Sequence, residues 1–278
     1  MARVVCDKNP LFSYTVAMTD YKEFAEDIAR QAGKIIKDSF KLGIEKQIKE
    51  DTSFVTEADL AINALVLAEI AKRFPTHSVL SEEGSNLIHE SEYVWVCDPL
   101  DGTKAFAHGL PFGCFSLALV KDGEVLLGVI NDPLSDRLYS AQKGMGATLN
   151  GSLVSVSTMD TFGNALVNCD VTHRGKYDIV PLINEFFSMH SSVFRLSACI
   201  YASSLVAAGQ FVASIYCMTS AHDAAAIKII VEEAGGKVTD MHGREQRYDR
   251  AIDGLLVSNG VLHDELVALA EKFVVERK

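Results

Sequence analysis

Apolar residues recur at helical spacing in the first third of the chain. Between residues 20 and 40 they fall three or four positions apart, which predicts an amphipathic helix over that range. Asp20 followed by Glu23 is a residue pair typical of a helix N-terminus, so we expect this helix to begin at Asp20. A second helix is expected over residues 56–74, because the apolar stretch there is followed by Pro75, and helices usually end before a proline.

The middle of the chain consists of short apolar runs bounded by turn residues, a pattern typical of strands. Asp122-Gly123 and Asn150-Gly151 are dipeptides of tight hairpin turns. Because such short turns join the runs, we expect an antiparallel meander and not a series of βαβ units. The strands expected here cover residues 93–97, 115–121, 124–130 and 137–142.

From about residue 155 the pattern mixes helices with strands. The strands expected there are 165–168, 211–217, 237–239 and 255–258, and the helices are 176–189, 202–208, 222–234 and 263–277. We therefore expect an N-terminal α+β lobe, residues 1–155, and a C-terminal α/β lobe, residues 156–278. No repeat or flexible linker separates the two, so they are expected to pack as layers of one catalytic unit.

The charge and composition of the chain limit its partners. The formal net charge is −11, and no run of Lys and Arg is longer than two residues. Proteins that bind nucleic acid or anionic membranes normally carry a basic stripe, so neither partner is expected. No stretch approaches 18 uninterrupted apolar residues, which argues against a membrane-spanning helix.

The first ten residues lack the apolar segment of a secretion signal, so we expect a cytoplasmic protein. Cysteines are scattered without close pairs, which is typical of reduced, structural thiols in a reducing compartment. They are Cys6, Cys97, Cys114, Cys169, Cys199 and Cys217.

Two carboxylates follow an apolar strand in the run 95–104. Asp98 and Asp101 are three residues apart and Gly102 comes next, so negative charge is expected beside the N–H groups of a helix start. Glu82 ends another apolar segment. Oxygen ligands without a His or Cys partner select Mg²⁺ or Mn²⁺ over zinc, so the run indicates a metal-dependent phosphatase. An ordinary Asp-Gly turn and a solvated Glu82 loop are the alternative explanations.

Asp59 and Asp223 each lie in the first turn of a predicted helix. Thr56 precedes Asp59 by three residues, and Ser220 precedes Asp223 by the same interval. Both pairs fit the capping-box pattern, in which the acid only stabilises the helix start. A capping carboxylate can also point outward, so capping and catalysis are compatible.

Four stretches of the chain carry a resemblance to a known family. They are residues 55–59, 74–83, 95–106 with the core Asp-Pro-Leu-Asp-Gly-Thr, and 222–236. In this order they resemble the inositol monophosphatase superfamily of Mg²⁺-dependent, lithium-sensitive phosphatases, and the likeness extends from about residue 20 to residue 270. The resemblance implies an α+β fold, a layered α-β-α-β-α sandwich of the sugar-phosphatase type with a mostly antiparallel N-terminal sheet, and usually a homodimer.

The resemblance also implies a set of metal ligands. Glu82, Asp98 and the carbonyl of Leu100 would hold the first cation. Asp98, Asp101 and Asp223 would hold the second. The implied mechanism is two-metal activation of a water molecule that attacks phosphorus in line, with no protein nucleophile.

The same resemblance implies the residues that act on the substrate. Gly102 and Thr103 would offer backbone N–H groups to the phosphate. Thr103, assisted by Asp59, would orient or deprotonate the attacking water. The implied substrate-binding residues are Leu100, Asp101, Gly102, Thr103 and Asp223, and the implied catalytic residues are Asp59, Thr103 and Glu82.

Three positions depart from the family pattern. His222 replaces a tryptophan, Tyr216 falls near a glutamate that grips inositol, and residues 197–199 match the family's Gly-Ser/Thr-Ala segment poorly. We expect His222 either to pack in the protein or to contact the substrate. These departures leave phosphate hydrolysis intact but put inositol in doubt.

Lys104 resembles the lysine of members that cleave histidinol phosphate or 3′-phosphoadenosine nucleotides, or is simply a surface lysine. We therefore expect a phosphomonoesterase for a small phosphorylated alcohol of the inositol-1-monophosphate type. Histidinol-phosphate phosphatase and 3′(2′),5′-bisphosphate nucleotidase are the alternatives. A non-catalytic regulatory protein is the alternative from another class, although such a protein need not retain the acidic residues.

Overall fold

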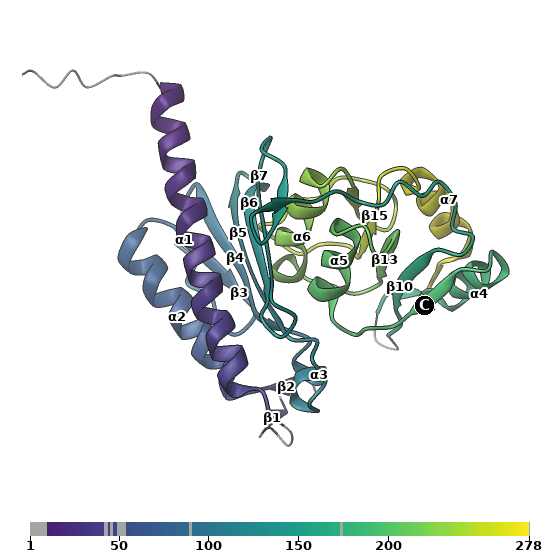
Figure 1. Cartoon of the computed structure of the whole chain (residues 1–278), viewed down its shortest axis with the longest axis horizontal. Helices are drawn as coiled ribbons and strands as arrows, with labels where there is room; N and C mark the ends of the chain where they lie inside the picture. Colours follow the sequence, from purple (N-terminus) through teal and green to yellow (C-terminus); the bar gives the residue numbers. More distant parts are fainter. Residues whose placement is uncertain are drawn as a thin grey trace, which may run out of the picture.

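Two helices cover one face of a large sheet and begin the layered structure (Figure 1). The computed structural model describes residues 10–41, 44, 47–48, 54–88, 91–172 and 175–277. Helix α1 runs over Pro10–Ser39 and α2 over Glu57–Arg73. A short hairpin lies between them, with strands β1 (Gln47–Ile48) and β2 (Phe54–Val55).

Helix α1 begins ten residues earlier than predicted, so the expected start at Asp20 is wrong. No Gly or Pro interrupts residues 11–19, and a proline is well tolerated in the first turn of a helix, so the helix can extend back to Pro10. Asp20 instead forms an ion pair with Arg73 of α2. The prediction for α2 is confirmed to within one residue at each end.

The seven-stranded sheet has the order β3-β4-β5-β6-β7-β8-β9. Strands β3 and β4 are parallel and all other neighbours are antiparallel, which confirms the meander. The strands are β3 (Ser78–Ser81), β4 (Tyr93–Asp101), β5 (Cys114–Lys121), β6 (Glu124–Asp132), β7 (Arg137–Gln142), β8 (Ala147–Leu149) and β9 (Ser152–Leu153).

Both faces of this sheet are buried, which explains the nearly continuous apolar runs. Along β5, Phe115, Leu117 and Leu119 belong to the core under α1 and α2. Ala118 and Val120, on the other face, belong to the core shared with two inner helices. Because successive side chains of a strand point to opposite faces of the sheet, β5 contributes to two separate cores.

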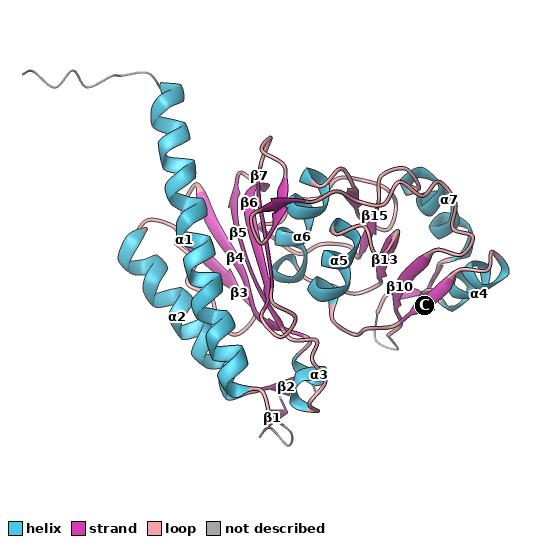
Figure 2. Ribbon diagram, viewed as in Figure 1, coloured by secondary structure: helices cyan, strands magenta, loops and turns pink. Residues whose placement is uncertain are grey.

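The inner helices are α5 (Cys199–Ala207) and α6 (Ala221–Glu233), which lie between the two sheets (Figure 2). Helix α6 comes very close to β6. A Cβ at Gly128 would stand 2.7 Å from Cγ2 of Ile229 and 3.1 Å from Cα of Ala226. Only glycine allows this close approach of α6 to the middle of β6.

The second sheet has the order β12-β10-β13-β15-β14, and α4 (Val180–Ser188) and α7 (His263–Phe273) lie beyond it. Strand β10 is parallel to β12 and β13, and the remaining pairs are antiparallel. The strands are β10 (Leu166–Asp170), β12 (Ser192–Phe194), β13 (Ala213–Tyr216), β14 (Lys237–Thr239) and β15 (Leu255–Ser258). The five alternating layers confirm the α-β-α-β-α fold and the α+β class.

Two predicted helices are too long. The helix expected over 176–189 begins only at Val180, and the helix expected over 263–277 ends at Phe273. The missing ends form a small antiparallel pair, β11 (Tyr177–Asp178) with β16 (Val275–Glu276). Pro181 fixes the start of α4, and β-branched residues at 274–275 favour the extended backbone.

Each of the five cysteines in the described part of the chain is a free thiol, and Cys6 lies outside it. The prediction that the first ten residues contain no secretion signal is not tested, because residues 1–9 lie outside the described part of the chain. No helix in the described ranges is both long and apolar enough to cross a membrane. The division into lobes at residue 155 stays a prediction.

Candidate functional site

An irregularity in β4 brings two carboxylates to the same side of the strand. The register of β4 against β5 shifts between Asp98 and Asp101. Pro99 supplies no N–H for the ladder, and the N–H of Leu100 instead donates to Oδ1 of Asp98 at 2.9 Å. Residues three apart on a regular strand point to opposite faces, so the bulge is what allows both carboxylates to point into one site.

Asp223 is the third carboxylate at this position, from the first turn of α6. Its Oδ2 accepts hydrogen bonds from the N–H of Ser220 at 2.7 Å and the hydroxyl of Thr219 at 3.0 Å. The expected capping box of α6 is therefore present. It uses one carboxylate oxygen and fixes the direction of the other.

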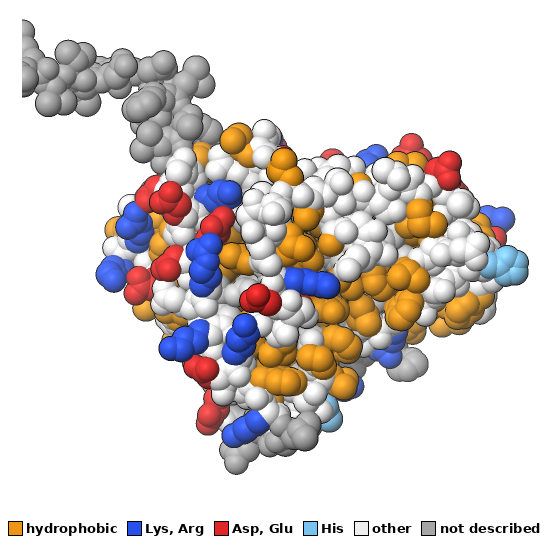
Figure 3. Space-filling view, viewed as in Figure 1, with side chains coloured by type: hydrophobic (Ala, Val, Ile, Leu, Met, Phe, Trp, Pro, Cys, Tyr) orange, Lys and Arg blue, Asp and Glu red, His pale blue; other side chains and the backbone are white. Residues whose placement is uncertain are grey.

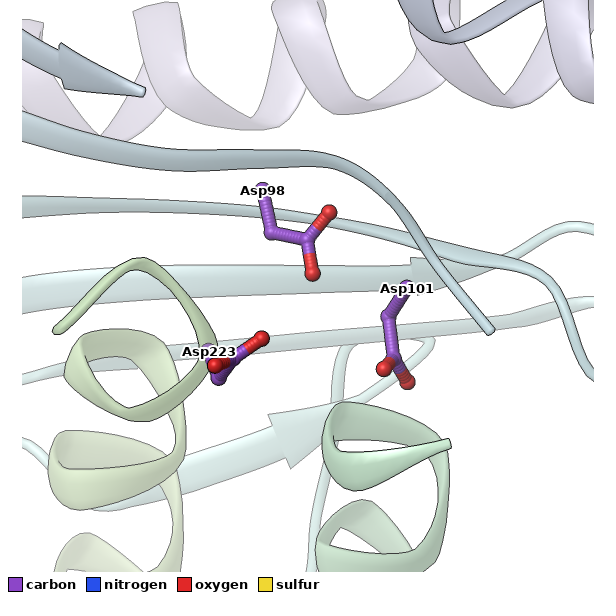
Figure 4. Close-up of side chains that lie close together, drawn as sticks. All are labelled: Asp98, Asp101 and Asp223. Carbon is purple, nitrogen blue, oxygen red and sulfur yellow. The ribbon is translucent and has the colours of Figure 1, made fainter. Parts of the chain in front are cut away.

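The three carboxylates form one group, in which an oxygen of each lies within 4.8 Å of an oxygen of the others. They are Asp98, Asp101 and Asp223, and Figure 4 shows them between the end of β4 and the first turn of α6. Asp98 and Asp101 are buried, and Asp223 is half-buried. All the donors are carboxylate oxygens, which is the donor set that hard divalent cations prefer.

Asp101 also caps helix α5, a contact that the sequence did not reveal. Its carboxylate accepts three N–H groups from the first turn of α5, those of Cys199, Ile200 and Tyr201, each at 2.9 Å. The N-cap residue of this helix, Ala198, has no polar side chain to do so. Asp101 therefore caps α5 from β4 and ties the inner helix to the site.

Burial and mutual repulsion disfavour charge on these groups when nothing compensates for it. Burial raises the pKa of Asp98 well above its usual range, and the carboxylates of Glu82, Asp101 and Asp223 raise it further. Burial also raises the pKa of Asp101 to about 7, against the lowering effect of its backbone donors. A bound cation would remove both penalties, so the electrostatics of the group fit a metal site.

Thr103 and Asp59 are brought together as expected. The Thr103 hydroxyl lies 3.1 Å from Oδ1 of Asp59 and 2.8 Å from the carbonyl oxygen of Leu100. The other oxygen of Asp59 accepts the N–H and the hydroxyl of Thr56, at 2.8 and 2.5 Å, so its capping box is also present. Burial raises the pKa of Asp59.

Gly102 lies between the carboxylates and the short helix α3 (Thr103–Ala107). Its φ is +78°, and a Cβ there would stand 2.7 Å from the carbonyl oxygen of Phe112. Both facts require glycine. The first N–H groups of a helix have no partner within it, so binding of phosphate by Gly102 and Thr103 stays a prediction that this backbone allows.

Glu82 directly follows β3 and is half-buried. Among the charged neighbours of Asp98 it has the largest effect on the pKa, so it lies near the group. It is not one of the three residues within 4.8 Å of one another in the described part of the chain. Its role as a ligand, like that of the Leu100 carbonyl, stays a prediction.

Tyr216 is buried beneath α5. Its hydroxyl donates to the carbonyl oxygen of Cys199 at 3.0 Å and accepts from Asn168 and Ser214. The tyrosine thus supports the helix that Asp101 caps. His222 is partly buried, with Nε2 3.9 Å from a carboxylate oxygen of Asp223, and Lys104 is exposed.

The comparisons with known proteins agree with this geometry. The model of the inositol monophosphatase family matches residues 17–274. The chain is 33% identical over 263 residues to a fructose-1,6-bisphosphatase/inositol-1-monophosphatase of Thermotoga maritima, covering 92% of this chain and 98% of the relative. It is 33% identical over 255 residues to a histidinol-phosphatase of Chlorobaculum parvum, covering 90% and 96%.

Among solved structures, the Thermotoga maritima IMPase superimposes with a TM-score of 0.82 at 29% identity, covering 91% of this chain and 97% of that one. The family match spans nearly the whole chain and includes every residue of the acidic group. The chain therefore belongs to the inositol monophosphatase family and is a phosphatase.

Proposed function

We propose that this phosphatase is a Mg²⁺-dependent phosphomonoesterase that hydrolyses a small phosphorylated alcohol. The observation that carries the proposal is the group of three carboxylates, from β4 and α6, within 4.8 Å of one another. Two of them are buried and have raised pKa values. Such a group is stable in its ionised form only with a compensating cation, and its oxygen donors favour Mg²⁺.

The residues that would hold the cations follow from the geometry and the family resemblance. Glu82, Asp98 and the Leu100 carbonyl would hold one, and Asp98, Asp101 and Asp223 would hold the other. When bound, the cations would supply positive charge to the phosphate oxygens and lower the pKa of a water molecule. The carboxylates themselves are already oriented by hydrogen bonds, so binding requires little rearrangement.

The chain supplies the groups that position the attacking water and the phosphate. The Thr103 hydroxyl has one proton to donate, and it lies within reach of Oδ1 of Asp59 and of the Leu100 carbonyl oxygen. If the Leu100 carbonyl binds a cation, Asp59 is the remaining acceptor, and the lone pairs of the Thr103 oxygen can orient the water. Thr56 holds the other oxygen of Asp59, so the pair is rigid. The N–H groups of Gly102 and Thr103 would receive the phosphate oxygens.

Inositol 1-phosphate is the first substrate to test, and histidinol phosphate is a second candidate. The inositol-binding glutamate of the family would fall near Tyr216, which is buried in contact with Cys199. Lys104 is exposed one residue beyond Thr103 and could meet a second anionic group on a substrate. The relatives act on different esters by name, so only a substrate panel separates them.

The test is phosphate release from a panel of esters by the purified chain. The panel contains inositol 1-phosphate, histidinol phosphate, fructose 1,6-bisphosphate and 3′-phosphoadenosine 5′-phosphate, each with Mg²⁺ and with EDTA. We expect one ester to be hydrolysed with Mg²⁺ and none with EDTA. Asp101→Asn should abolish the activity, and Asp160→Asn, at an exposed loop position, should not.

Two results would contradict the proposal. Undiminished Mg²⁺-dependent hydrolysis by Asp101→Asn would show that the metal site is elsewhere. Absence of hydrolysis of any ester at every Mg²⁺ concentration would favour a regulatory protein instead. We also propose a homodimer in the cytoplasm, and light scattering during size-exclusion chromatography tests its mass.

A further inference from the structure

A charged groove of about 810 Å³ runs between α1 and the strands β6 to β8. It shares no residue with the acidic group. Helix α1 covers the outer face of the seven-stranded sheet, whereas α6, which carries Asp223, packs on the inner face (Figure 1). The groove and the candidate active site are therefore separate.

The groove exists because the apolar face of α1 is too narrow to cover the whole sheet. Ile28 and Ile36 pack with Leu117 and Val129 of β5 and β6. Beyond these strands the sheet presents polar residues to the helix. The hydroxyl of Ser140 on β7 donates to Glu26 of α1 at 2.8 Å. A polar groove therefore lies between α1 and these strands, where an apolar core would otherwise continue.

Cationic side chains form a row along one wall of the groove. Lys22, Arg30 and Lys34 recur on one helix face, Lys37 continues the row, and Arg137 faces it from β7. Figure 3 shows Lys and Arg side chains interspersed with Asp and Glu over the side of the molecule that carries α1. Three acidic residues also line the groove, Glu26, Asp38 and Asp136, so five positive charges face three negative ones in a chain of net charge −11.

The carboxylates of the groove leave part of this positive charge available. Glu26 pairs with both Lys22 and Arg30, at 3.6 and 3.1 Å. Lys37 lies 3.8 Å from Asp136, whose side chain is 96% exposed and can turn away. Within the described part of the chain, no ion pair joins Lys34 or Arg137 to a carboxylate. The cations that line the groove therefore outnumber its carboxylates, and the buried Asp132 on β6, opposite Arg137, offsets only part of that excess.

We propose that this groove binds a small anion with several negative charges, of the polyphosphate or sugar-bisphosphate class. Its volume lies in the range of small-molecule sites, and several cations along one wall favour a ligand with separated anionic groups. The described lining residues include no aromatic side chain. Binding of single-stranded nucleic acid usually relies on stacking of bases on aromatic rings, so a polynucleotide is the poorer occupant.

The test is calorimetric titration of inorganic tripolyphosphate into the purified protein at low salt, with EDTA to remove divalent cations. We expect saturable binding to one site. Lys34→Gln and Arg137→Gln should each weaken it about fivefold, the effect of one unit charge at contact distance in water. Lys272→Gln, an exposed lysine of α7 outside the groove, is the matched control.

Asp136→Asn should act in the opposite direction. The residue has φ +58°, a conformation that asparagine adopts readily, so the turn should keep its shape. Loss of the carboxylate frees Lys37, and binding should tighten about threefold. This variant tests the proposal even if the cation variants lose stability, since it is expected to gain affinity.

Binding should persist in Asp223→Asn, which separates the groove from the acidic group. Absence of saturable binding at millimolar tripolyphosphate would overturn the proposal. Equal weakening by Lys34→Gln and by Lys272→Gln would overturn it as well, because that result indicates diffuse charge attraction without a site. Loss of binding in Asp223→Asn would place the ligand at the candidate active site instead.

Discussion

Replacing Asp223 by asparagine should stabilise the metal-free protein and remove its response to Mg²⁺. The carboxylate uses Oδ2 to accept hydrogen bonds from Ser220 and Thr219. An asparagine carbonyl can accept the same two bonds, so the start of α6 stays capped. The amide nitrogen then replaces the oxygen that faces the other carboxylates, and one negative charge is lost.

The size of the effect follows from the separation of the charges. The carboxylate oxygens lie within 4.8 Å of one another, and two unit charges at that limit repel by about 1 kcal/mol in water and about 3.5 kcal/mol at an effective dielectric constant of 20. Asp101 has a pKa of about 7 and is therefore only partly ionised at neutral pH. We therefore expect the substitution to remove about 1–2 kcal/mol of repulsion, the lower part of this range. For a chain of this size, that gain in stability raises the melting temperature by about 2–8 °C.

The assay is thermal unfolding with and without Mg²⁺, with Asp160→Asn as a control at an exposed position. A ligand at 100 times its dissociation constant stabilises the native state by about 2.7 kcal/mol, so Mg²⁺ should raise the melting temperature of the wild type by about 5–10 °C. The Asp223→Asn variant should show little of this shift. A variant that melts below the metal-free wild type, or that responds fully to Mg²⁺, would refute the reasoning.

The pH dependence of the metal-free protein gives an independent check of the same argument. The pKa values of Asp98 and Asp101 are raised in the folded state, so folding favours their protonated forms. The contribution of Asp101 to stability is complete below about pH 4 and is lost as the pH rises through about 7. The contribution of Asp98 is likewise lost as the pH rises. Asp223 raises both pKa values, so Asp223→Asn should reduce this loss.

Three further substitutions test individual parts of the structure. Thr103→Val should lower kcat at least about 100-fold because the hydroxyl beside Asp59 is lost, whereas Thr103→Ser should retain most activity in the phosphate-release assay. Gly102→Ala should destabilise the protein by about 1–3 kcal/mol in urea unfolding, since its Cβ would clash with the Phe112 carbonyl at positive φ. Burial lowers the pKa of His263 to about 4. The contribution of its neutral imidazole to folding stability is therefore lost as the pH falls from about 6.5 to about 4. His263→Gln should lose less stability than the wild type over that interval.

The accuracy of the sequence-based fold depended on whether local signals marked both ends of an element. Strand β7 was predicted to the residue because turn residues bound it on each side. Helix α1 has no such marker at Asp20, and an acidic pair inside a helix looks the same as one at its start. Strands β11 and β16 pair residues about a hundred positions apart, and two-residue strands have no periodicity to detect.

The acidic residues of the site could be predicted, but their structural connections could not. The run containing Asp98 and Asp101 is recognisable in the sequence because charge rarely follows a buried strand without a purpose. The capping of α5 by Asp101 depends on the packing of β4 against a helix a hundred residues later. The row of cationic residues on α1 was not predicted either, because residues three or four apart on a helix do not form a run in the sequence.

The hydrogen bonds at the two helix starts are compatible with both the capping role of Asp59 and Asp223 and the functional role proposed for them. Each helix begins with a hydroxyl residue three positions before the aspartate, and in each the backbone N–H at the cap binds Oδ2 of the acid. The helix start thus holds one oxygen, and the other is left at a fixed angle toward the site: Oδ1 of Asp59 meets Thr103. A side chain that already stabilises its helix loses little further entropy on binding a ligand, so substitution by alanine would remove a helix cap as well as a functional group, and only asparagine separates the two effects.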